Sequence, residues 1–272
     1  MDKKNTETKN IGRTFCVGDI HGGYLGLVQV LEKVNFDYDN DKLIALGDVT
    51  DGWPDVAESI EELMKIKNLV YLKGNHDEWT ERFLKWTLEH GIKMSSNNRM
   101  WYYQGGEATV DSYKEHPELV KKHLKFLGEA KLYHIDEDNR IYMHAGFNPN
   151  LQLHKQYQLN VGQKNGENAL FYWDRQFWAH MIALRENGSI NPGDKIWENY
   201  NEIYIGHTPT INYEDGEMPI NVGNVWNMDT GATYSGRLSI MDVETKEITQ
   251  SDPLYQLYPD HMGRNGEYLA KE

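Results

Sequence analysis

TFCVGDIHG, residues 14–22, is the stretch that decides the fold. Its opening apolar run stops at a glycine, which is typical of a buried strand, and an aspartate and a histidine follow directly. Apolar residues then recur at helical spacing from Leu25 to Val34. The same unit follows twice more, with strands expected at 43–46 and 69–72. This alternation predicts an α/β fold built on a parallel sheet with helices packed on it.

The alternation stops after about residue 90, and the rest of the sheet is expected to be rich in strands. These further strands are expected at 131–135, 140–143, 202–205, 225–228 and 237–243. The regions around 91–130 and 148–200 are predicted to be helical or irregular insertions. No low-complexity linker separates them from the core, so we expect residues 1–272 to form one domain.

Composition limits the possible partners. The 272 residues carry a formal charge of −14, and an acidic surface repels nucleic acid and membranes, so we expect no broad nucleic-acid groove and no membrane partner. No run approaches the ~20 apolar residues of a membrane span, and residues 1–10 do not resemble a signal peptide. The single cysteine, Cys16, excludes an intrachain disulfide. Together these features favour a cytoplasmic protein.

Residues that can bind metals follow five of the expected strands. The five motifs are GDIHG (18–22), GDVTD (47–51), GNHD (74–77), HAG (144–146) and GHT (206–208). In an open α/β sheet the loops at the carboxyl ends of the strands share one crevice, so these motifs would converge. One aspartate after a strand is usually a cap or a turn residue, but five such motifs are hard to explain by capping.

The residue types in these motifs suit a pair of divalent metals. A mixed set of imidazole, carboxylate and amide ligands suits manganese, iron or zinc. Two metals need one carboxylate that bridges them, and together they activate a shared water and hold phosphate oxygens. An anionic substrate also needs a local reversal of the negative field, and two cations would provide it.

The ordered set of five motifs resembles the calcineurin-like metallophosphoesterases, and most of all the branch with the protein serine/threonine phosphatases. Two further stretches, 105–113 and 227–238, resemble bacterial and phage members of that branch. The resemblance implies a four-layer αββα sandwich of mixed sheets flanked by helices. It also implies that a water bridging two metals hydrolyses a phosphoric monoester. Manganese is the expected metal, with iron, zinc, nickel or magnesium as alternatives.

The resemblance also implies a role for each matching residue. The implied metal ligands are Asp19 and His21 for the first metal, Asp48 as the bridge, and Asn75, His144 and His207 for the second. His76 would protonate the leaving alkoxide as general acid, which suits an imidazole near neutral pH. Asp51 would orient His76 or support its charge.

Phosphate binding is expected from Arg175 and from Asn75. Arg175 closes the segment FYWDR, 171–175, and its guanidinium offers a planar fork that matches phosphate. One departure concerns the second motif, which in the eukaryotic-type phosphatases continues Asp-Arg-Gly and here reads Asp51-Gly52-Trp53. One phosphate-binding arginine is therefore missing. Either Arg175 acts alone or another residue substitutes, and the candidates are Lys73, Arg82 and Arg99.

The expected substrate is a phosphorylated protein or a small phosphoester. A symmetrical dinucleoside tetraphosphate hydrolase shares all five motifs and is the main alternative, which an aromatic clamp near the metals would favour. Aromatic residues at 101–103 and 171–178 could wall the cleft, although we favour a core position for most of them. A nuclease or cyclic-nucleotide phosphodiesterase is less favoured because of the net charge. A scaffold without catalysis is disfavoured because His76 and Asp48 are both present.

Overall fold

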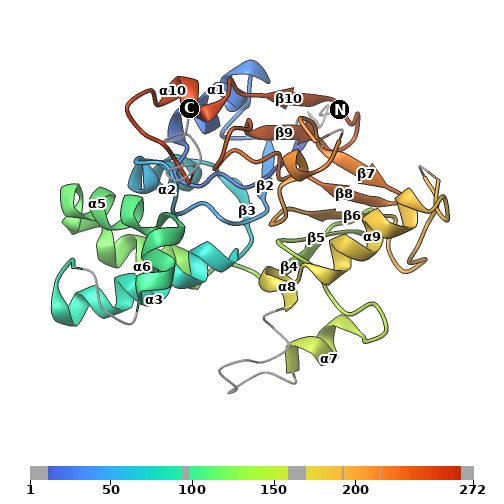
Figure 1. The fold of residues 1–272 in the computed structure, drawn as a ribbon, viewed down its shortest axis with the longest axis horizontal. Helices are drawn as coiled ribbons and strands as arrows, with labels where there is room; N and C mark the ends of the chain where they lie inside the picture. Colours follow the sequence, from blue (N-terminus) through green and yellow to red (C-terminus); the bar gives the residue numbers. More distant parts are fainter. Residues whose placement is uncertain (1–11, 94–97, 159–169, 192, 215, 265–272) are drawn as a thin grey trace, which may run out of the picture.

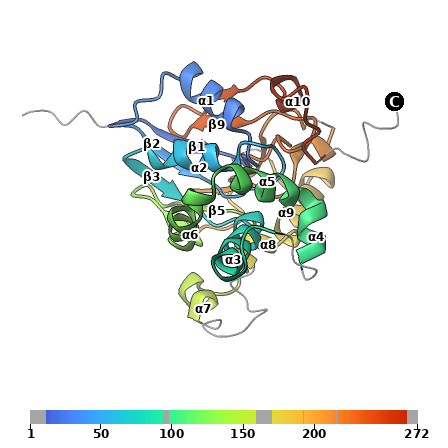
Figure 2. The same cartoon turned by 90° about the vertical axis from the view of Figure 1, so that its left-hand side faces the viewer.

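A computed structural model describes residues 12–93, 98–158, 170–191, 193–214 and 216–264. These residues contain two five-stranded sheets (Figures 1 and 2). The first sheet has the order β10 (Ile248–Gln250), β9 (Ser239–Asp242), β1 (Thr14–Val17), β2 (Lys42–Ala45) and β3 (Asn68–Tyr71). The second has the order β4 (Tyr133–Ile135), β5 (Arg140–Met143), β6 (Glu202–Ile205), β8 (Val225–Asn227) and β7 (Ile220–Val222).

Both sheets are mixed, with parallel strands that carry antiparallel neighbours. In the first sheet β1, β2 and β3 pair in parallel, while β9 runs antiparallel to β1 and to β10. In the second sheet β5, β6 and β8 pair in parallel, and β4 and β7 are antiparallel edges. The parallel strands of each sheet therefore end at a common edge, where their loops can meet.

Helices cover the outer faces of the sheets and form a group on one side. Their bounds are α1 (Tyr24–Lys33), α2 (Val56–Met64), α3 (Asn75–His90), α4 (Arg99–Trp101), α5 (Glu107–Glu115), α6 (Val120–Gly128), α7 (Leu153–Gln158), α8 (Leu170–Trp173), α9 (Gln176–Glu186) and α10 (Leu254–Leu257). Figure 1 shows α3, α5 and α6 gathered on one side of the sheets, away from α9. None of the helices in the described ranges has the length and apolar character that a membrane crossing requires.

The order of the layers follows from the alternation of side chains along the strands. Neighbouring residues of a strand point to opposite faces of its sheet. Phe15 and Leu43 pack in the cluster that contains α1 and α2. Cys16 and Ile44 point the other way and pack against Tyr142 of the second sheet. A third cluster buries the far face of the second sheet against α9. The layers are helix, sheet, sheet and helix, as predicted.

All eight expected strands are present, with small shifts at their ends. The strands β1, β5 and β6 have the predicted bounds, and β2 and β3 each begin and end one residue earlier than predicted. The strands β7 and β10 were not predicted, because each has only three residues and lies at the edge of its sheet, where the apolar pattern is weak. Both predicted insertions contain helices, and residues 94–97 and 159–169 within them lie outside the described residues.

Candidate active site

The five predicted motifs meet at the edge where the parallel strands of both sheets end. Asp19 follows β1, Asp48 follows β2, His144 follows β5 and His207 lies two residues after β6, while Asn75 is the first residue of α3. Each of these residues is at most 4 % exposed. The two sheets therefore contribute side chains to one buried polar centre, which agrees with the convergence expected from the sequence.

The second and third motifs are locked together by Asp77, for which no role was predicted. Its carboxylate accepts backbone N–H groups from Asp48 at 2.8 Å, from Val49 at 2.9 Å and from Gly74 at 2.9 Å. A side chain at Gly74 would place its Cβ 2.0 Å from Oδ1 of Asp48, so only glycine allows this approach. The backbone carrying Asp48 is thereby held against the start of α3.

Four residues of the centre have a left-handed backbone conformation. The φ angles are 51° at His21, 48° at Asp48, 71° at Asp51 and 68° at His207. Non-glycine residues seldom adopt this region, and each instance costs about 1–3 kcal/mol and tends to occur at functional sites. The folded chain therefore carries local strain in order to aim these side chains inward.

Asp19, His21 and Asp48 form the first group of potential metal ligands, with one ligand atom from each within 4.8 Å of the others. Nε2 of His21 lies 4.0 Å from Oδ2 of Asp19 and 3.7 Å from Oδ2 of Asp48. Nδ1 of His21 lies 3.1 Å from the carbonyl oxygen of Thr50, which can only accept a hydrogen bond. The proton therefore lies on Nδ1, and the lone pair of Nε2 faces the carboxylates.

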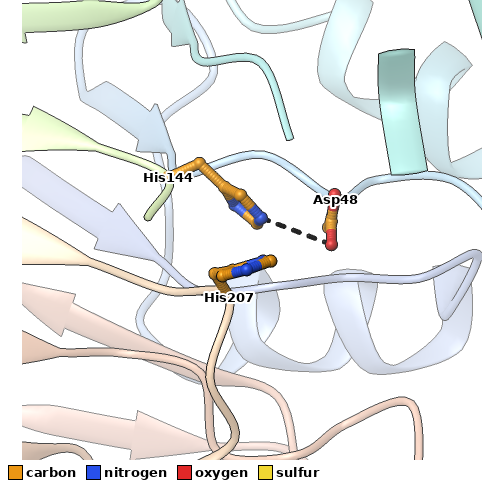
Figure 3. A group of neighbouring side chains, drawn as sticks. All are labelled: Asp48, His144 and His207. Atoms are coloured by element: carbon orange, nitrogen blue, oxygen red, sulfur yellow. Dashed lines mark ion pairs between the residues drawn. The ribbon is translucent and has the colours of Figure 1, made fainter. Parts of the chain in front are cut away.

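Asp48, His144 and His207 form the second group, again within 4.8 Å (Figure 3). Nε2 of His144 lies 3.3 Å from Oδ2 of Asp48 and 3.2 Å from Oδ1 of Asn75. Nδ1 of His144 donates to the carbonyl of Leu46 at 2.9 Å, which fixes the tautomer as in the first group. Both ring nitrogens of His207 are buried and have no hydrogen-bond partner in the described part of the chain. Such groups usually have partners, and a cation would supply one.

The electrostatics of the centre also suit bound cations. Burial acts to raise the pKa of Asp48, but the imidazole of His144 holds it well below its usual range. Burial and the carboxylate of Asp229 raise the pKa of Asp19 well above its usual range. Burial and His144 lower the pKa of His207. Buried carboxylates and imidazole lone pairs at these distances fit two divalent cations that share Asp48.

The predicted acid and its partner lie beside the ligand groups. Nδ1 of His76 lies 2.7 Å from Oδ2 of Asp51, which is fully buried. The same carboxylate accepts the indole N–H of Trp101 at 2.7 Å and the hydroxyl of Thr109 at 2.5 Å. Thr80 adds a longer contact of 3.3 Å. With Asp51 bound to Nδ1, Nε2 of His76 is the nitrogen that can reach a substrate.

Most of the aromatic residues noted in the sequence are core residues, as we favoured. Phe171, Phe177 and Trp178 are buried in the cluster under α9. Trp101 is also buried, but its N–H binds Asp51, a role that sequence reasoning missed. Trp173 is partly exposed and lies with its ring centroid 6.5 Å from that of His207.

Arg175 lies next to the second ligand group. Its Nη1 is 3.2 Å from the carbonyl oxygen of His207 and 3.3 Å from Oγ1 of Thr208. The side chain is exposed, and no carboxylate of the described ranges forms an ion pair with it. Its donors are therefore available to an anion at the His207 side of the centre.

Within the described ranges, none of the three candidates for the missing arginine makes a side-chain hydrogen bond or an ion pair with a residue of the centre. Lys73 and Arg82 form ion pairs with glutamates of α3, and Arg99 is exposed at the start of α4. An arginine that was not predicted lies at the centre instead. Nη1 of Arg264 is 3.2 Å from Nε2 of His76. It belongs to no motif and follows the last one by many residues, so only its position in space could identify it.

Comparison with known proteins places this geometry in a family. Residues 12–219 match the model described as calcineurin-like phosphoesterase. Serine/threonine-protein phosphatase 1 of Salmonella typhimurium is 23% identical over 244 residues, which cover 88% of this chain and 95% of that protein. The asymmetrical bis(5'-nucleosyl)-tetraphosphatase PrpE of Halalkalibacterium halodurans is 24% identical over 260 residues, which cover 88% and 94%.

The fold has counterparts among solved structures. A protein assigned as a diadenosine tetraphosphatase superimposes with a TM-score of 0.56 at 19% identity, over 89% of this chain and 94% of that one. At this identity the likeness shows the fold alone, namely two mixed sheets flanked by helices. The family match, however, spans most of the chain and includes all five motifs. The chain therefore belongs to the calcineurin-like phosphoesterase family and is a hydrolase of phosphoester bonds.

Proposed function

We propose that this protein is a phosphoric monoester hydrolase of the serine/threonine protein phosphatase type, dependent on two divalent metal ions, with manganese as the expected metal. The observation that supports this proposal most strongly is the position of Asp48, whose carboxylate belongs to both ligand groups. Two cations bound there would neutralise charge on the phosphoryl oxygens and activate the attacking water. Asn75 would add its amide oxygen to the second group, next to His144.

The side chains around the ligand groups supply the remaining parts of the reaction. A proton on Nε2 of His76 would be transferred to the leaving oxygen, a task that suits an imidazole near neutral pH. Asp51 holds the ring through Nδ1 and would stabilise the charged imidazolium. Arg175 would hold a phosphoryl oxygen through its guanidinium on the His207 side.

A cavity of about 1020 Å³ is linked to the centre through Arg264, which lines the cavity and contacts His76, and it therefore bears on the choice of substrate. Its lining contains five carboxylates and two permanently charged cations. These residues are Asp55, Glu58, Glu107, Asp111 and Glu115, with Lys114 and Arg264 as the cations. The net negative field would repel a tetraphosphate chain and attract basic side chains. The cavity therefore favours a phosphopeptide with basic residues near the phosphorylated side chain.

A dinucleoside tetraphosphate is the second candidate substrate. Relatives named PrpE carry that activity in their names, and Tyr102, Tyr103 and Tyr234 line the same cavity. Their rings could stack on a nucleobase, which is a sequence-tolerant contact. The carboxylates of the cavity count against this candidate, and the tyrosines count for it.

The proposal is tested by metal removal and by a comparison of substrates. Protein treated with a chelator should lose hydrolysis of an aryl phosphate and regain it with Mn²⁺. If no divalent metal restores turnover, the metal-dependent mechanism is wrong. The ratio kcat/KM should be highest for a phosphopeptide with basic flanking residues, lower for a matched peptide with acidic flanking residues, and lowest for diadenosine tetraphosphate. A higher value for the dinucleotide would overturn the substrate class and leave the metal centre in place.

A further inference from the structure

The last described residues of the chain place an arginine at the candidate acid. Arg264 and His76 are 188 positions apart in the sequence, yet Nη1 of Arg264 lies 3.2 Å from Nε2 of His76. We propose that Arg264 binds the phosphoryl group of the substrate and so replaces the arginine that is missing from the second motif. This inference rests on the proposed hydrolase function.

The segment that leads to Arg264 is anchored on the residues that follow Asp51. Trp53 is fully buried, and its ring stacks on Tyr258 with centroids 5.3 Å apart and an interplanar angle of 17°. The hydroxyl of Tyr258 donates to Asp55 at 2.8 Å. At the other end, the backbone N–H of Arg264 donates to the carbonyl of Thr233 at 3.0 Å. These contacts fix where the arginine enters the site.

Gly52, which stands where a motif arginine would be, has no room for a side chain. Its φ is +93°, and a Cβ there would lie 2.7 Å from Oγ1 of Thr233. Arg264 passes close to this point. A Cβ at Gly105 would lie 2.8 Å from the nitrogen of Gly52 and 3.2 Å from Cγ of Arg264. The segment that leads to Arg264 therefore places the guanidinium beside Gly52, where the second motif has no room for a side chain of its own.

The surroundings of Arg264 leave its donors free for an anion. Its guanidinium lies 5.2 Å from the ring centroid of Tyr234, and no carboxylate forms an ion pair with it within the described residues. Lys73 and Arg82 both have carboxylate partners, whereas Arg264, like Arg175, has none among the described residues. A guanidinium only donates hydrogen bonds, and its planar fork matches phosphate oxygens.

The contact between Arg264 and His76 also suggests how the two side chains share the reaction. Since the guanidinium donates, Nε2 of His76 accepts in the structure described. With a phosphate ester in place, the donors of Arg264 would turn to the phosphoryl oxygens. Nε2 of His76, released by the guanidinium, would take up a proton from solvent and face the leaving oxygen. Arg264 on this side and Arg175 on the His207 side would hold the phosphoryl group from two directions.

The test measures phosphate binding directly, on protein reconstituted with Mn²⁺. Isothermal titration calorimetry with inorganic phosphate compares the wild type with Arg264→Ala, Arg264→Gln and Arg264→Lys. Arg13→Gln is the control, because it neutralises an exposed arginine that precedes β1, at the end of the strand opposite to Asp19. We expect the Kd for phosphate to rise about tenfold to a hundredfold in the Ala and Gln variants and less in the Lys variant. The control and the metal content should not change.

Kinetics with a series of aryl phosphates then separates phosphate binding from positioning of His76. The loss in kcat/KM for Arg264→Ala should be the same for good and poor leaving groups, because all the esters share the phosphoryl group. An unchanged Kd for phosphate would overturn the proposal, and so would a loss that grows with the basicity of the leaving group. Failure of the wild type to hydrolyse any phosphoester with any metal would instead reject the hydrolase function, since the phosphate Kd does not depend on turnover.

Discussion

The metal-ligand cluster around Asp48 and the acid side around His76 adjoin each other but are built differently. Every ligand lies within four residues of a strand end or begins α3, so the hydrogen-bonded sheets place it. The acid side takes Asp51 from a strand end, but Trp101 and Thr109 come from the 91–130 insertion and Arg264 from the chain end. The cluster is thus a property of the two sheets, whereas the surroundings of the acid depend on long-range packing.

This comparison predicts different consequences for substitutions in the two regions. Changes in the cluster should remove metal and activity together. Changes on the acid side should leave metal in place and alter turnover or phosphate binding alone.

Asp48→Asn should have the largest effect, because it removes the one carboxylate that both ligand groups share. The variant keeps the size of the side chain but loses its charge, so we expect loss of bound metal and a fall in kcat/KM of roughly 10³-fold or more. Metal content by elemental analysis and hydrolysis of an aryl phosphate measure the two effects. Glu89→Gln, which neutralises an exposed carboxylate, is the control. Full metal content with normal turnover would contradict the bridging role.

His76→Asn should keep metal and lose turnover, which is the opposite signature. A lost general acid costs about 10²–10⁴-fold. The cost should shrink for aryl phosphates whose leaving groups need no proton, and it should be largest for alkyl phosphates. Metal content is expected to match that of the wild type. Equal losses across the leaving groups would show that His76 is not the acid.

The smallest effect concerns the pH dependence of metal binding. Burial alone would lower the pKa of His144, but the carboxylates of Asp48 and Asp19 raise it to about 9. A raised pKa means that protonated His144 stabilises the metal-free fold below about pH 6.5, and that this stability is lost as the pH rises to about 9. A metal needs the unprotonated Nε2, so metal binding releases this proton.

Metal affinity should therefore increase between pH 6.5 and 9, by about tenfold to a hundredfold in the pH range set by His144. The difference in Tm between metal-loaded and chelator-treated protein should widen over the same range. Asp48→Asn removes the main charge that raises the pKa of His144, so its chelated form should show a weaker pH dependence of Tm. A difference in Tm that is constant from pH 6.5 to 9 would argue against protonation of His144 in the metal-free protein.

The parts of the fold that could be predicted share strong local signals. The strand β1 and the helix α1 follow from an apolar run, a glycine and a helical period, and they were located almost to the residue. The edge strands β7 and β10 lack such a signal because three residues carry little periodicity. The same holds for Asp77, whose role as an acceptor for backbone N–H groups is visible only when the second and third motifs are placed together.

For this protein, local pattern was enough to name the chemistry: five motifs that each place a glycine and a ligand after a strand indicated a family, a sheet edge and a donor set. That was possible because parallel pairing forces strand ends to one edge, so neighbours in space can be inferred from repeated short motifs. The surroundings of His76 could not be inferred in this way. The contacts of Trp101, Thr109 and Arg264 depend on how the 91–130 insertion and the C-terminal segment pack against Asp51 and Trp53. Such packing cannot be predicted from the spacing of residues along the chain.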